Sequence, residues 1–451
     1  MEEIKKVRTG QMDMLNGPLT GKIVLFALPL AASSILQQLF NAADVAVVGR
    51  FAGNQALAAV GGNSSVINLL VNLFVGFSVG ANVVIARYIG EGRTEKIQRT
   101  VHTVISMALI CGVILAFLGN MAAEPLLKLM NTPSEVLPLA AVYLKIYFGG
   151  MPFFMLYNFG SAVLRSVGDT QKPLYCLIVS GVINVALNLL LVIVFQLSVV
   201  GVAVATVTAN GVSAGMILLF LTRSKGAIRL DLRKLNLCRE EIVKIIKIGA
   251  PAGLQGMVFS FSNVCIQSAI NGFGTDAIAG SAAALNYEFF TYFVTSAFTQ
   301  AAVTFTSQNY GAGRYGRCKK VWRISAVLGV LGTGFLSIVF VAGHNFFLSI
   351  FAADAAAVSF GAVRMMHIQI FSFMPPLYEV TGGVLRGMGY SMTPAVLTMF
   401  GSCVVRIIWI YTVFAWKPSL AVLFWVYPFS WIITIALILG AFFFIGRKVL
   451  I

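Results

Sequence analysis

Charged side chains are scarce in this sequence. Only 11% of the 451 residues are Asp, Glu, Lys or Arg, whereas about 25% is usual for soluble domains. Hydrophobic residues make up 58% of the chain, and the mean hydropathy is +0.88. A soluble globular protein is therefore excluded, because runs of about 20 apolar residues, enough to cross a bilayer, fill most of the sequence.

The residues that most enzymes and pumps need are also few. His102, His344 and His367 are scattered and form neither a metal set nor a catalytic triad. The six cysteines show no C-x-x-C spacing, so we expect reduced thiols. The sequence has no phosphate-binding G-x-x-x-x-G-K-[ST] motif and no room for a soluble domain. These absences disfavour an enzyme or an ATP-driven pump, and we expect no cofactor.

Long apolar segments follow one another along the chain. They predict an all-α integral membrane protein with twelve transmembrane helices. The expected spans are 23–49, 56–86, 100–120, 136–163, 173–196, 199–222, 248–273, 277–309, 321–343, 357–385, 394–415 and 420–446.

The basic residues indicate how the chain crosses the membrane. With the N-terminus inside, the outer loops hold only Arg50, Lys128 and Lys417, while the inner segments are rich in Lys and Arg from Lys5 onward. Basic loops stay on the cytoplasmic side. We therefore expect a multi-pass protein of the bacterial inner membrane with both termini cytoplasmic. The net charge of +16 then reflects topology and not a nucleic-acid partner.

The two halves of the chain repeat one another at an offset of 221 residues. The repeated positions are Gly92 and Gly313, Arg93 and Arg314, Tyr157 and Tyr378, Arg165 and Arg386, Gly168 and Gly389, and Pro173 and Pro394. Six spans per repeat give both halves the same orientation, so a pseudo-two-fold axis should run along the membrane normal. We expect an N-terminal six-helix lobe over 1–222, a cytoplasmic linker over 223–247 and a C-terminal six-helix lobe over 248–451.

The repeated glycines and prolines have an expected structural role. A Gly after the last turn permits a left-handed conformation that ends a helix. Pro is tolerated in the first turn of the next helix, where its missing N–H costs nothing. We expect Gly92, Gly168, Gly313 and Gly389 to end helices in this way.

Asp44 is the clearest ionisable group inside a span. Ionisable groups in the membrane are costly and are functional candidates by default. Gln37, Asn41 and Asp44 fall on one helical face, and Gln38 adjoins them. We expect Gln37, Gln38 and Asn41 to line the substrate cavity. The carboxylate of Asp44 can bind a proton or Na⁺, either of which changes the preferred conformation. The alternative is an Asp that is merely solvated near the outer surface.

Oxygen-bearing side chains in the fifth and sixth spans complete a candidate cation site. Asn184 and Asn188 lie one turn apart, and Thr206 follows in the sixth span. Together with Asp44 they could form a small site for Na⁺, a hard ion that takes oxygen ligands. The alternative is that small polar residues only join the helices.

The second half does not repeat this site. Cys265 stands where Asp44 would recur, and the carboxylates are Glu288 and Glu379 instead. Asn158 is the first-half partner of Glu379, and Tyr157 and Tyr378 precede this pair. We expect these residues to face the substrate cavity, with a structural ion pair as the alternative. Arg406 could neutralise one of the two glutamates.

Several motifs together resemble those of a known family. The segments QQLFNAADVAVVGR (37–50) and ALAAVG (56–61), the G-x-G-R turns and both L-R-x-x-G elements are similar to multidrug and toxic compound extrusion (MATE) transporters. The resemblance covers about 15–447. It implies two six-helix lobes around a central cavity, and export of cationic amphipathic compounds coupled to Na⁺ or H⁺.

The resemblance also assigns site residues. It implies that Asp44 is the first-span acid of the cation site, Asn184 its fifth-span Asn and Thr206 its sixth-span Thr, with Na⁺ possible at these three. The chain departs from many bacterial members at Asn188, where they carry an Asp. Only one carboxylate then serves the N-lobe site.

These observations predict a bacterial Na⁺- or H⁺-coupled antiporter that acts as a monomer. Its partners would be cationic amphipathic small molecules and membrane lipids. One alternative is a flippase for lipids or lipid-linked oligosaccharides, which would need more Lys and Arg in the spans. Another is a channel, which buried acids in a two-lobe repeat without a pore-loop motif disfavour.

Overall fold

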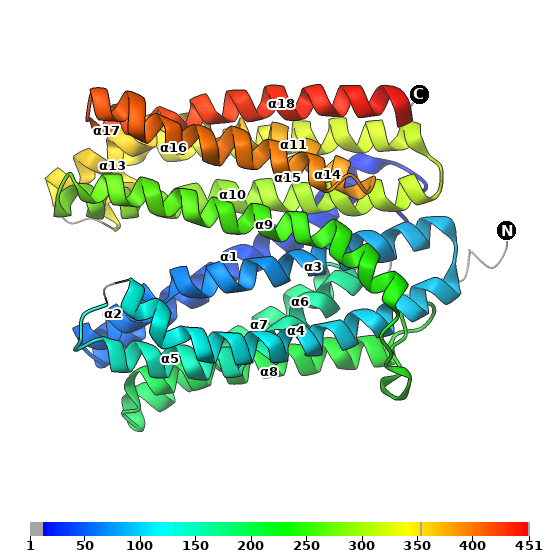
Figure 1. The fold of residues 1–451 in the computed structure, drawn as a ribbon, viewed down its shortest axis with the longest axis horizontal. Helices are drawn as coiled ribbons and strands as arrows, with labels where there is room; N and C mark the ends of the chain where they lie inside the picture. Colours follow the sequence, from blue (N-terminus) through cyan, green and yellow to red (C-terminus); the bar gives the residue numbers. More distant parts are fainter. Residues whose placement is uncertain (1–11, 131, 352–353, 450–451) are drawn as a thin grey trace. The chain divides into compact units, whose positions relative to one another are not determined.

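The structure is a computed structural model that describes residues 12–130, 132–351 and 354–449 (Figure 1). All regular elements in these ranges are helices, as the sequence predicted. Lys5, which entered the topology prediction, lies outside the described residues.

The helices of the first half are α1 (Leu19–Phe51), α2 (Asn54–Gly62), α3 (Ser64–Glu91), α4 (Thr94–Leu129), α5 (Leu137–Gly149), α6 (Met151–Ser166), α7 (Gln171–Asn188) with the π-helical η2 (Leu189–Val194), α8 (Ser198–Arg223) and the 3₁₀ turn η3 (Leu232–Lys234).

Those of the second half are α9 (Arg239–Asn271), α10 (Thr275–Gly311), α11 (Tyr315–Ala342), α12 (His344–Ser349), α13 (Ala355–His367), η4 (Gln369–Phe371), α14 (Pro375–Gly387), α15 (Met392–Thr398), η5 (Met399–Val404), α16 (Val405–Trp409), η6 (Ile410–Phe414), α17 (Leu420–Phe424) and α18 (Val426–Val449).

Within the described residues, nine helices are long and apolar enough to cross a membrane, and up to eleven if each of two bent pairs is one span. The remaining expected span, 277–309, is the helix α10. Its many Thr, Ser, Asn and Gln residues lower its hydropathy, and most of them are buried against neighbouring helices. A buried helix can afford this composition because its polar groups meet protein rather than lipid.

The two bent spans have identifiable causes. Helices α5 and α6 meet at 47° around Gly150, and Pro152 stands in the first turn of α6. The segment from α13 to η4 meets α14 at 49°, where Pro375 and Pro376 begin the second helix. A Pro at these positions cannot donate to the preceding turn, so the helix breaks there.

The four repeated glycines adopt the expected left-handed conformation. The φ angles are 69° at Gly92, 89° at Gly168, 71° at Gly313 and 99° at Gly389. At the end of α3, the N–H of Gly92 donates to the carbonyl of Ile89 at 3.1 Å. The duplicated sequence therefore builds the same helix ends twice.

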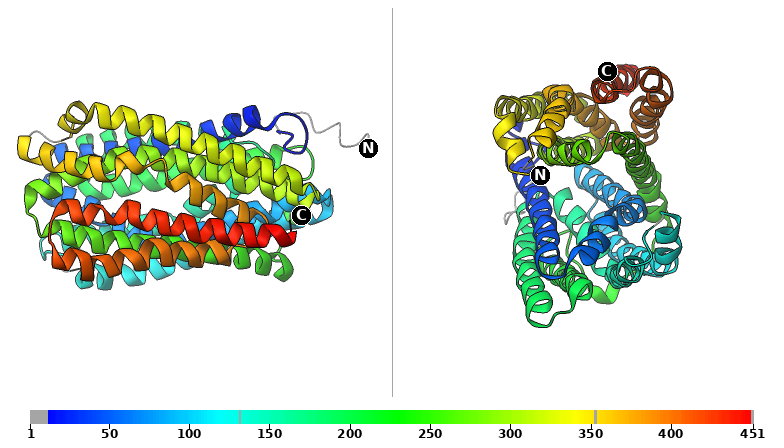
Figure 2. Two further views of the ribbon diagram at one scale, coloured as in Figure 1. Left: turned by 90° about the horizontal axis from the view of Figure 1, so that it is seen from above. Right: turned by 90° about the vertical axis from the view of Figure 1, so that its left-hand side faces the viewer.

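The helices form two compact units, and both α1 and α9 contribute to each of them. One unit holds Ala32–Gly253, and the other holds Met14–Ala31 together with the chain from Leu254 onward. Helix α9 begins at Arg239, inside the stretch 223–247 that we expected to link the halves. The end-on view in Figure 2 shows the helices of each unit standing side by side.

Each unit has its own core. In the first unit, α6 packs against α3, α4 and α8, around buried Leu144, Phe148 and Phe159. In the second unit, α10 packs along α11, α13 and α14. Buried Phe424 and Ile438 belong to that unit's largest cluster.

Small residues let α3 and α9 approach closely within the first unit. A Cβ atom on Gly80 would lie 2.2 Å from the carbonyl oxygen of Ile245, and one on Gly249 would lie 2.6 Å from the Cα of Phe77. Gly76 and Gly253 meet in the same way one turn along. Each helix thus presents a G-x-x-x-G pair, the arrangement that brings membrane helices into backbone contact.

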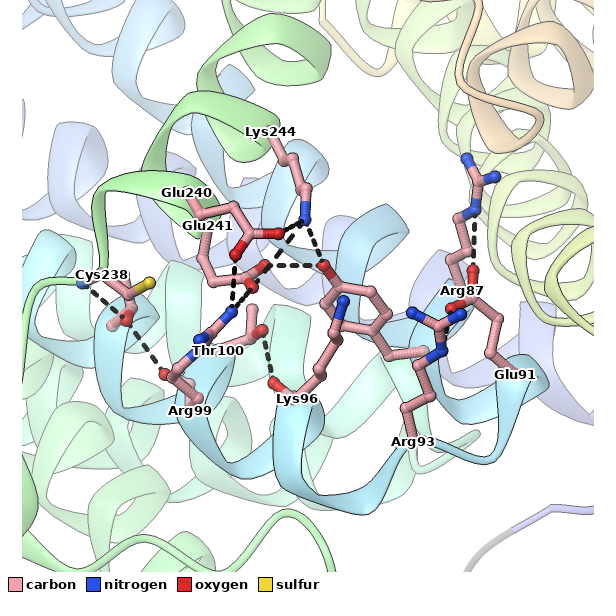
Figure 3. Close-up of polar contacts among 12 residues, drawn as sticks. Arg87, Glu91, Arg93, Lys96, Arg99, Thr100, Cys238, Glu240, Glu241 and Lys244 are labelled. Carbon is pink, nitrogen blue, oxygen red and sulfur yellow. Dashed lines mark hydrogen bonds and ion pairs between the residues drawn. The ribbon is translucent and has the colours of Figure 1, made fainter.

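An ion-pair network holds the first turn of α9 against α3 and α4 (Figure 3). The carboxylate of Glu241 is fully buried and accepts hydrogen bonds from the Tyr88 hydroxyl at 2.9 Å and from Arg99 at 2.7 Å. Lys244 donates to the Tyr88 hydroxyl at 2.8 Å. Glu240 receives a second Arg99 bond at 2.9 Å but is half exposed.

The second unit holds the chain before α1 in a similar way. Asn309, at the end of α10, donates to the carbonyl oxygen of Met14 at 3.2 Å. Arg317 donates to the carbonyl of Gly17 at 2.9 Å, and Arg314 bonds the side chain of Asn16 at 3.0 Å. Arg314 and Arg317 are the repeat partners of Arg93 and Lys96. Equivalent positions in the two units therefore bind the start of α1 and the start of α9.

We predict that Glu241→Gln lowers the thermal stability of the purified protein. The substitution leaves two donors without their anion in a buried position, which costs about 1–3 kcal/mol. Glu240→Gln is the matched control, because an exposed pair contributes about 0–1 kcal/mol. Thermal unfolding followed by size-exclusion chromatography measures both. Equal shifts for the two variants would show that Glu241 does not anchor α9.

Candidate functional site

The predicted cation-site residues come together in the first unit. Asp44 lies on α1 and is only 8% exposed. Asn184 and Asn188 approach it from α7 and are also buried, and Thr206 reaches it from α8. Three helices therefore contribute one group of oxygen-bearing side chains.

Hydrogen bonds connect all four residues. Asn188 donates through Nδ2 to Oδ1 of Asp44 and, at 3.3 Å, to Oδ1 of Asn184. Asn184 donates to the Thr206 hydroxyl at 3.4 Å, and that hydroxyl lies 3.4 Å from Oδ2 of Asp44. The Thr206 hydroxyl also donates to the carbonyl of Val202 at 2.9 Å. A single carboxylate thus sits inside a ring of neutral polar groups.

Local features of α7 bring its two asparagines to α1. A Cβ atom on Gly181 would overlap the ring of Phe40, so only glycine allows α7 this close to α1. Asn184 and Asn188 follow at one-turn intervals on the same face. Directly after Asn188 the helix becomes π-helical over Leu189–Val194. Such segments frequently occur at functional sites.

One oxygen of this cluster lacks a donor. Oδ1 of Asn188 is buried and has no hydrogen-bond partner among the described residues. A buried acceptor without a partner costs free energy, and a cation would satisfy it. Asp44, Asn184, Asn188 and Thr206 could each supply an oxygen ligand to a hard cation such as Na⁺. In the described ranges, no group of three His, Cys, Asp or Glu residues could hold a metal ion.

The residues of α1 that we expected to line the substrate cavity lie apart from this cluster. Gln37 and Asn41 are exposed and Gln38 is half-buried. None of the three bonds to Asp44 within the described part of the chain.

Tyr157 and Asn158 on α6 serve neighbouring backbone groups. The Tyr157 hydroxyl donates to the carbonyl of Pro173 at 3.3 Å, which ties α6 to the start of α7. The Asn158 amide donates to the carbonyl of Phe154, one turn earlier, at 2.9 Å.

Glu288 on α10 forms an ion pair with Arg364 on α13. Two parallel bonds join them, from Nε to Oε1 at 2.6 Å and from Nη2 to Oε2 at 3.0 Å. Arg364 is 3% exposed and also lies over the rings of Phe424 and Tyr427. This geometry agrees with the structural ion pair that we kept as the alternative for Glu288.

Sequence reasoning did not identify Arg364 as that partner. The available signal was an arginine within the expected span 357–385, which needs an anion somewhere in the bundle. Arg406 instead lies 4.3 Å from the ring centroid of Tyr427 and donates to the Ser430 hydroxyl at 3.3 Å. Tyr427 therefore contacts both buried arginines.

Glu379 on α14 is a carboxylate of the second unit that has no direct partner among the described residues. Neither a hydrogen bond nor an ion pair reaches it within the described residues, although it interacts electrostatically with Arg386 and Tyr292. Arg386 donates to Gln255 at 3.0 Å, and the ring of Tyr292 is 57% exposed. The neighbouring Tyr378 is buried. An available negative charge beside an exposed aromatic ring suits a cationic ligand.

Comparison with known proteins identifies the family. The MatE family profile matches residues 29–190 and, a second time, residues 251–412. The chain belongs to the MatE family. The two matches lie at corresponding places in the two halves, in agreement with the duplication seen in the sequence. As a MatE protein it is a membrane transporter and not an enzyme.

Relatives of similar length carry the same architecture. The chain is 27% identical over 436 residues to a probable multidrug resistance protein, YoeA of Bacillus subtilis, covering 94% of this chain and 93% of that protein. It is 24% identical to the multidrug export protein MepA of Staphylococcus saprophyticus, covering 82% and 79% of the two chains. An outward-facing multidrug resistance MATE transporter superimposes with a TM-score of 0.87 at 22% identity, over 98% of both chains. The MATE fold expected from the motifs is confirmed.

We predict that Glu288→Gln destabilises this MatE protein and that adding Arg364→Gln restores much of the loss. Removing one partner of a buried pair costs about 3–5 kcal/mol, because the other charge is left uncompensated. Thermal unfolding and drug efflux are both measured. If the double variant recovers stability but not efflux, Glu288 or Arg364 also contacts the substrate.

Proposed function

We propose that this MatE transporter exports cationic amphipathic compounds from the bacterial cytoplasm in exchange for a cation bound at Asp44. The single observation that carries the proposal is the cluster of Asp44, Asn184, Asn188 and Thr206, in which one carboxylate accepts from the Asn188 amide and the Thr206 hydroxyl, and Asn184 bonds to both of these. A single negative charge matches a monovalent cation. The names of the relatives, which describe multidrug resistance and export, support the direction of transport.

The oxygen set favours Na⁺ over a proton as the coupling ion. A proton needs one acceptor, and Asp44 alone would suffice. Na⁺ takes several oxygen ligands, and the unpartnered Oδ1 of Asn188 is available as one of them. Because Asn188 is neutral, the site keeps only one negative charge, which one Na⁺ neutralises.

Binding of the cation would drive the conformational cycle. The site joins α1 to α7 and α8, so an occupied site stabilises whichever conformation keeps these three helices together. A ligand shifts an equilibrium only by its difference in affinity for the two states. Na⁺ entering from outside therefore favours the state that releases drug, and drug from the cytoplasm favours the state that releases Na⁺.

Glu379 is the residue that we propose to attract the cationic substrate. It lies in the other unit, on a helix that Pro375 and Pro376 begin, and the described residues leave its charge without a bonded partner. Tyr292 adds an exposed ring for aromatic cations.

We predict that everted vesicles containing the protein transport ethidium into the lumen when Na⁺ is more concentrated in the lumen than outside, at constant pH. The lumen of such a vesicle corresponds to the outside of the cell, so this gradient is inward for the cell. A pH gradient imposed without Na⁺ is the matched arm. Transport under Na⁺ alone supports coupling at the oxygen cluster, and transport under the pH gradient alone assigns the coupling to protons. Absence of transport under both gradients would refute the proposed antiport of cationic drugs.

We predict that Asp44→Asn abolishes coupled efflux while the protein still expresses and folds. The variant also loses the stabilisation by Na⁺, which for the wild type should reach about 2.7 kcal/mol at a Na⁺ concentration of 100 times Kd. Asp276→Asn, at an exposed Asp in the first turn of α10, is the control and should retain both properties. Unchanged efflux by Asp44→Asn would move the coupling site to Glu288 or Glu379.

A further inference from the structure

A small cavity opens between the start of α11 and the end of α18 in the second unit. Its volume is about 200 Å³. Its walls are basic and aromatic side chains, namely Lys319, Trp322, Arg323, Phe442, Phe443 and Arg447. None of the residues assigned above to ion or drug binding lines it.

Three positive charges converge on this cavity without a counter-ion among the described residues. No acidic side chain belongs to its lining, and neither an ion pair nor a hydrogen bond neutralises Lys319, Arg323 or Arg447 within the described residues. Lys319 and Arg323 are one turn apart on α11, where like charges repel each other. An anion in the cavity would relieve that repulsion.

A second basic cavity elsewhere shows the contrast. It is lined by Lys172, Arg223 and Lys225 at the ends of α7 and α8, but it also includes Asp169. Lys172 forms an ion pair with Asp169 at 2.7 Å, so this cavity supplies part of its own anion. The cavity between α11 and α18 does not.

An apolar stripe continues from the two basic residues of α11. Val327, Leu331, Phe335 and Ile338 follow Arg323 at steps of three or four residues and are 56%, 63%, 66% and 71% exposed. Side chains at these steps share one helical face. In a membrane protein, such exposed apolar residues contact acyl chains. Positive charge at one end of an apolar stripe is the complement of an anionic phospholipid.

We propose that this cavity binds the phosphodiester head group of an anionic phospholipid, with its acyl chains along the stripe from Val327 to Ile338. Arg323 and Arg447 can each offer a fork of N–H donors to phosphate oxygens, and Lys319 adds a compact charge. Basic pockets between membrane helices are suited to such head groups. The proposal is independent of which ion or drug the protein moves.

The aromatic wall of the cavity connects the lipid to the transport machinery. The indole N–H of Trp322 donates to the Thr381 hydroxyl on α14 at 2.9 Å, and its ring lies 4.8 Å from that of Phe442. Thr381 is two residues from Glu379 on the same helix. A lipid that fixes Trp322 would therefore also steady the helix that carries this carboxylate.

Tryptophan fluorescence offers a direct test with the purified full-length chain. The protein is placed in phosphatidylcholine vesicles to which one brominated lipid is added, either phosphatidylglycerol or phosphatidylcholine, with the bromine near the head group. Quenching of the fluorescence is recorded against the fraction of brominated lipid. Trp322→Phe identifies the part of the signal that comes from this cavity. We expect brominated phosphatidylglycerol to quench Trp322 at a much lower fraction than brominated phosphatidylcholine.

Variants that remove charges test whether the cavity causes the preference for phosphatidylglycerol. Lys319→Gln/Arg323→Gln should raise the half-quenching fraction of phosphatidylglycerol about 25-fold, since each basic residue contributes about fivefold. The control variant Lys247→Gln/Lys320→Gln removes two exposed charges outside the cavity and should leave the half-quenching fraction unchanged. If the double variant fails to fold, Arg447→Gln, on the other helix, should cause about a fivefold shift.

Two results would overturn the proposal. Equal quenching of Trp322 by the two brominated lipids would show that the cavity has no preference for an anionic head group. Loss of phosphatidylglycerol quenching in millimolar inorganic phosphate, but not in chloride of equal ionic strength, would show that a free phosphate ion is the ligand instead of a lipid.

Discussion

The cost of an unpaired charge inside a membrane organises both units of this protein. Arg364 is buried because Glu288 meets it with two bonds, and Arg406 because Tyr427 and Ser430 surround it. Asp44 is the contrasting case, since within the described residues only neutral groups bond to it. A carboxylate in that setting holds its charge at a cost that a bound cation removes. The difference between a paired and an unpaired charge therefore separates scaffold from candidate site.

The duplication is most faithful where the helices end. Gly92, Gly168, Gly313 and Gly389 all take positive φ, and equivalent positions in the two units bind the first helix of a half at its start. The contacts differ between the two units. The first unit binds the buried carboxylate of Glu241, and the second binds backbone carbonyls before α1. Side chains inside the spans have diverged much further, and the proposed ion and substrate residues are found there. Repetition maintains the folding of both units, and the candidate ligand residues lie where the two halves differ.

Prediction from sequence succeeded where a signal was local or repeated. Glycine at a helix end and Asp44 with the asparagines of α7 both follow from spacing or from family resemblance. Prediction from sequence was less complete for pairs of residues on helices that are distant in the chain. The bond from Arg364 to Glu288 spans 76 residues, and nothing in either neighbourhood specifies the other. Helix α9 begins at Arg239, inside the expected linker, because charged residues that usually mark a loop here form a network around the buried Glu241.

The sequence by itself determined the membrane class, the helical repeat, the family and the one carboxylate of the first-span site. Apolar length, periodicity and turn chemistry are properties of neighbouring residues, so the chain states them directly. Only the tertiary structure decided that Gln37 and Asn41 stand apart from Asp44, that Glu288 is paired while Glu379 is not, and that Lys319, Arg323 and Arg447 share one cavity. These outcomes depend on which helices meet at a given depth, and packing between remote segments settles that.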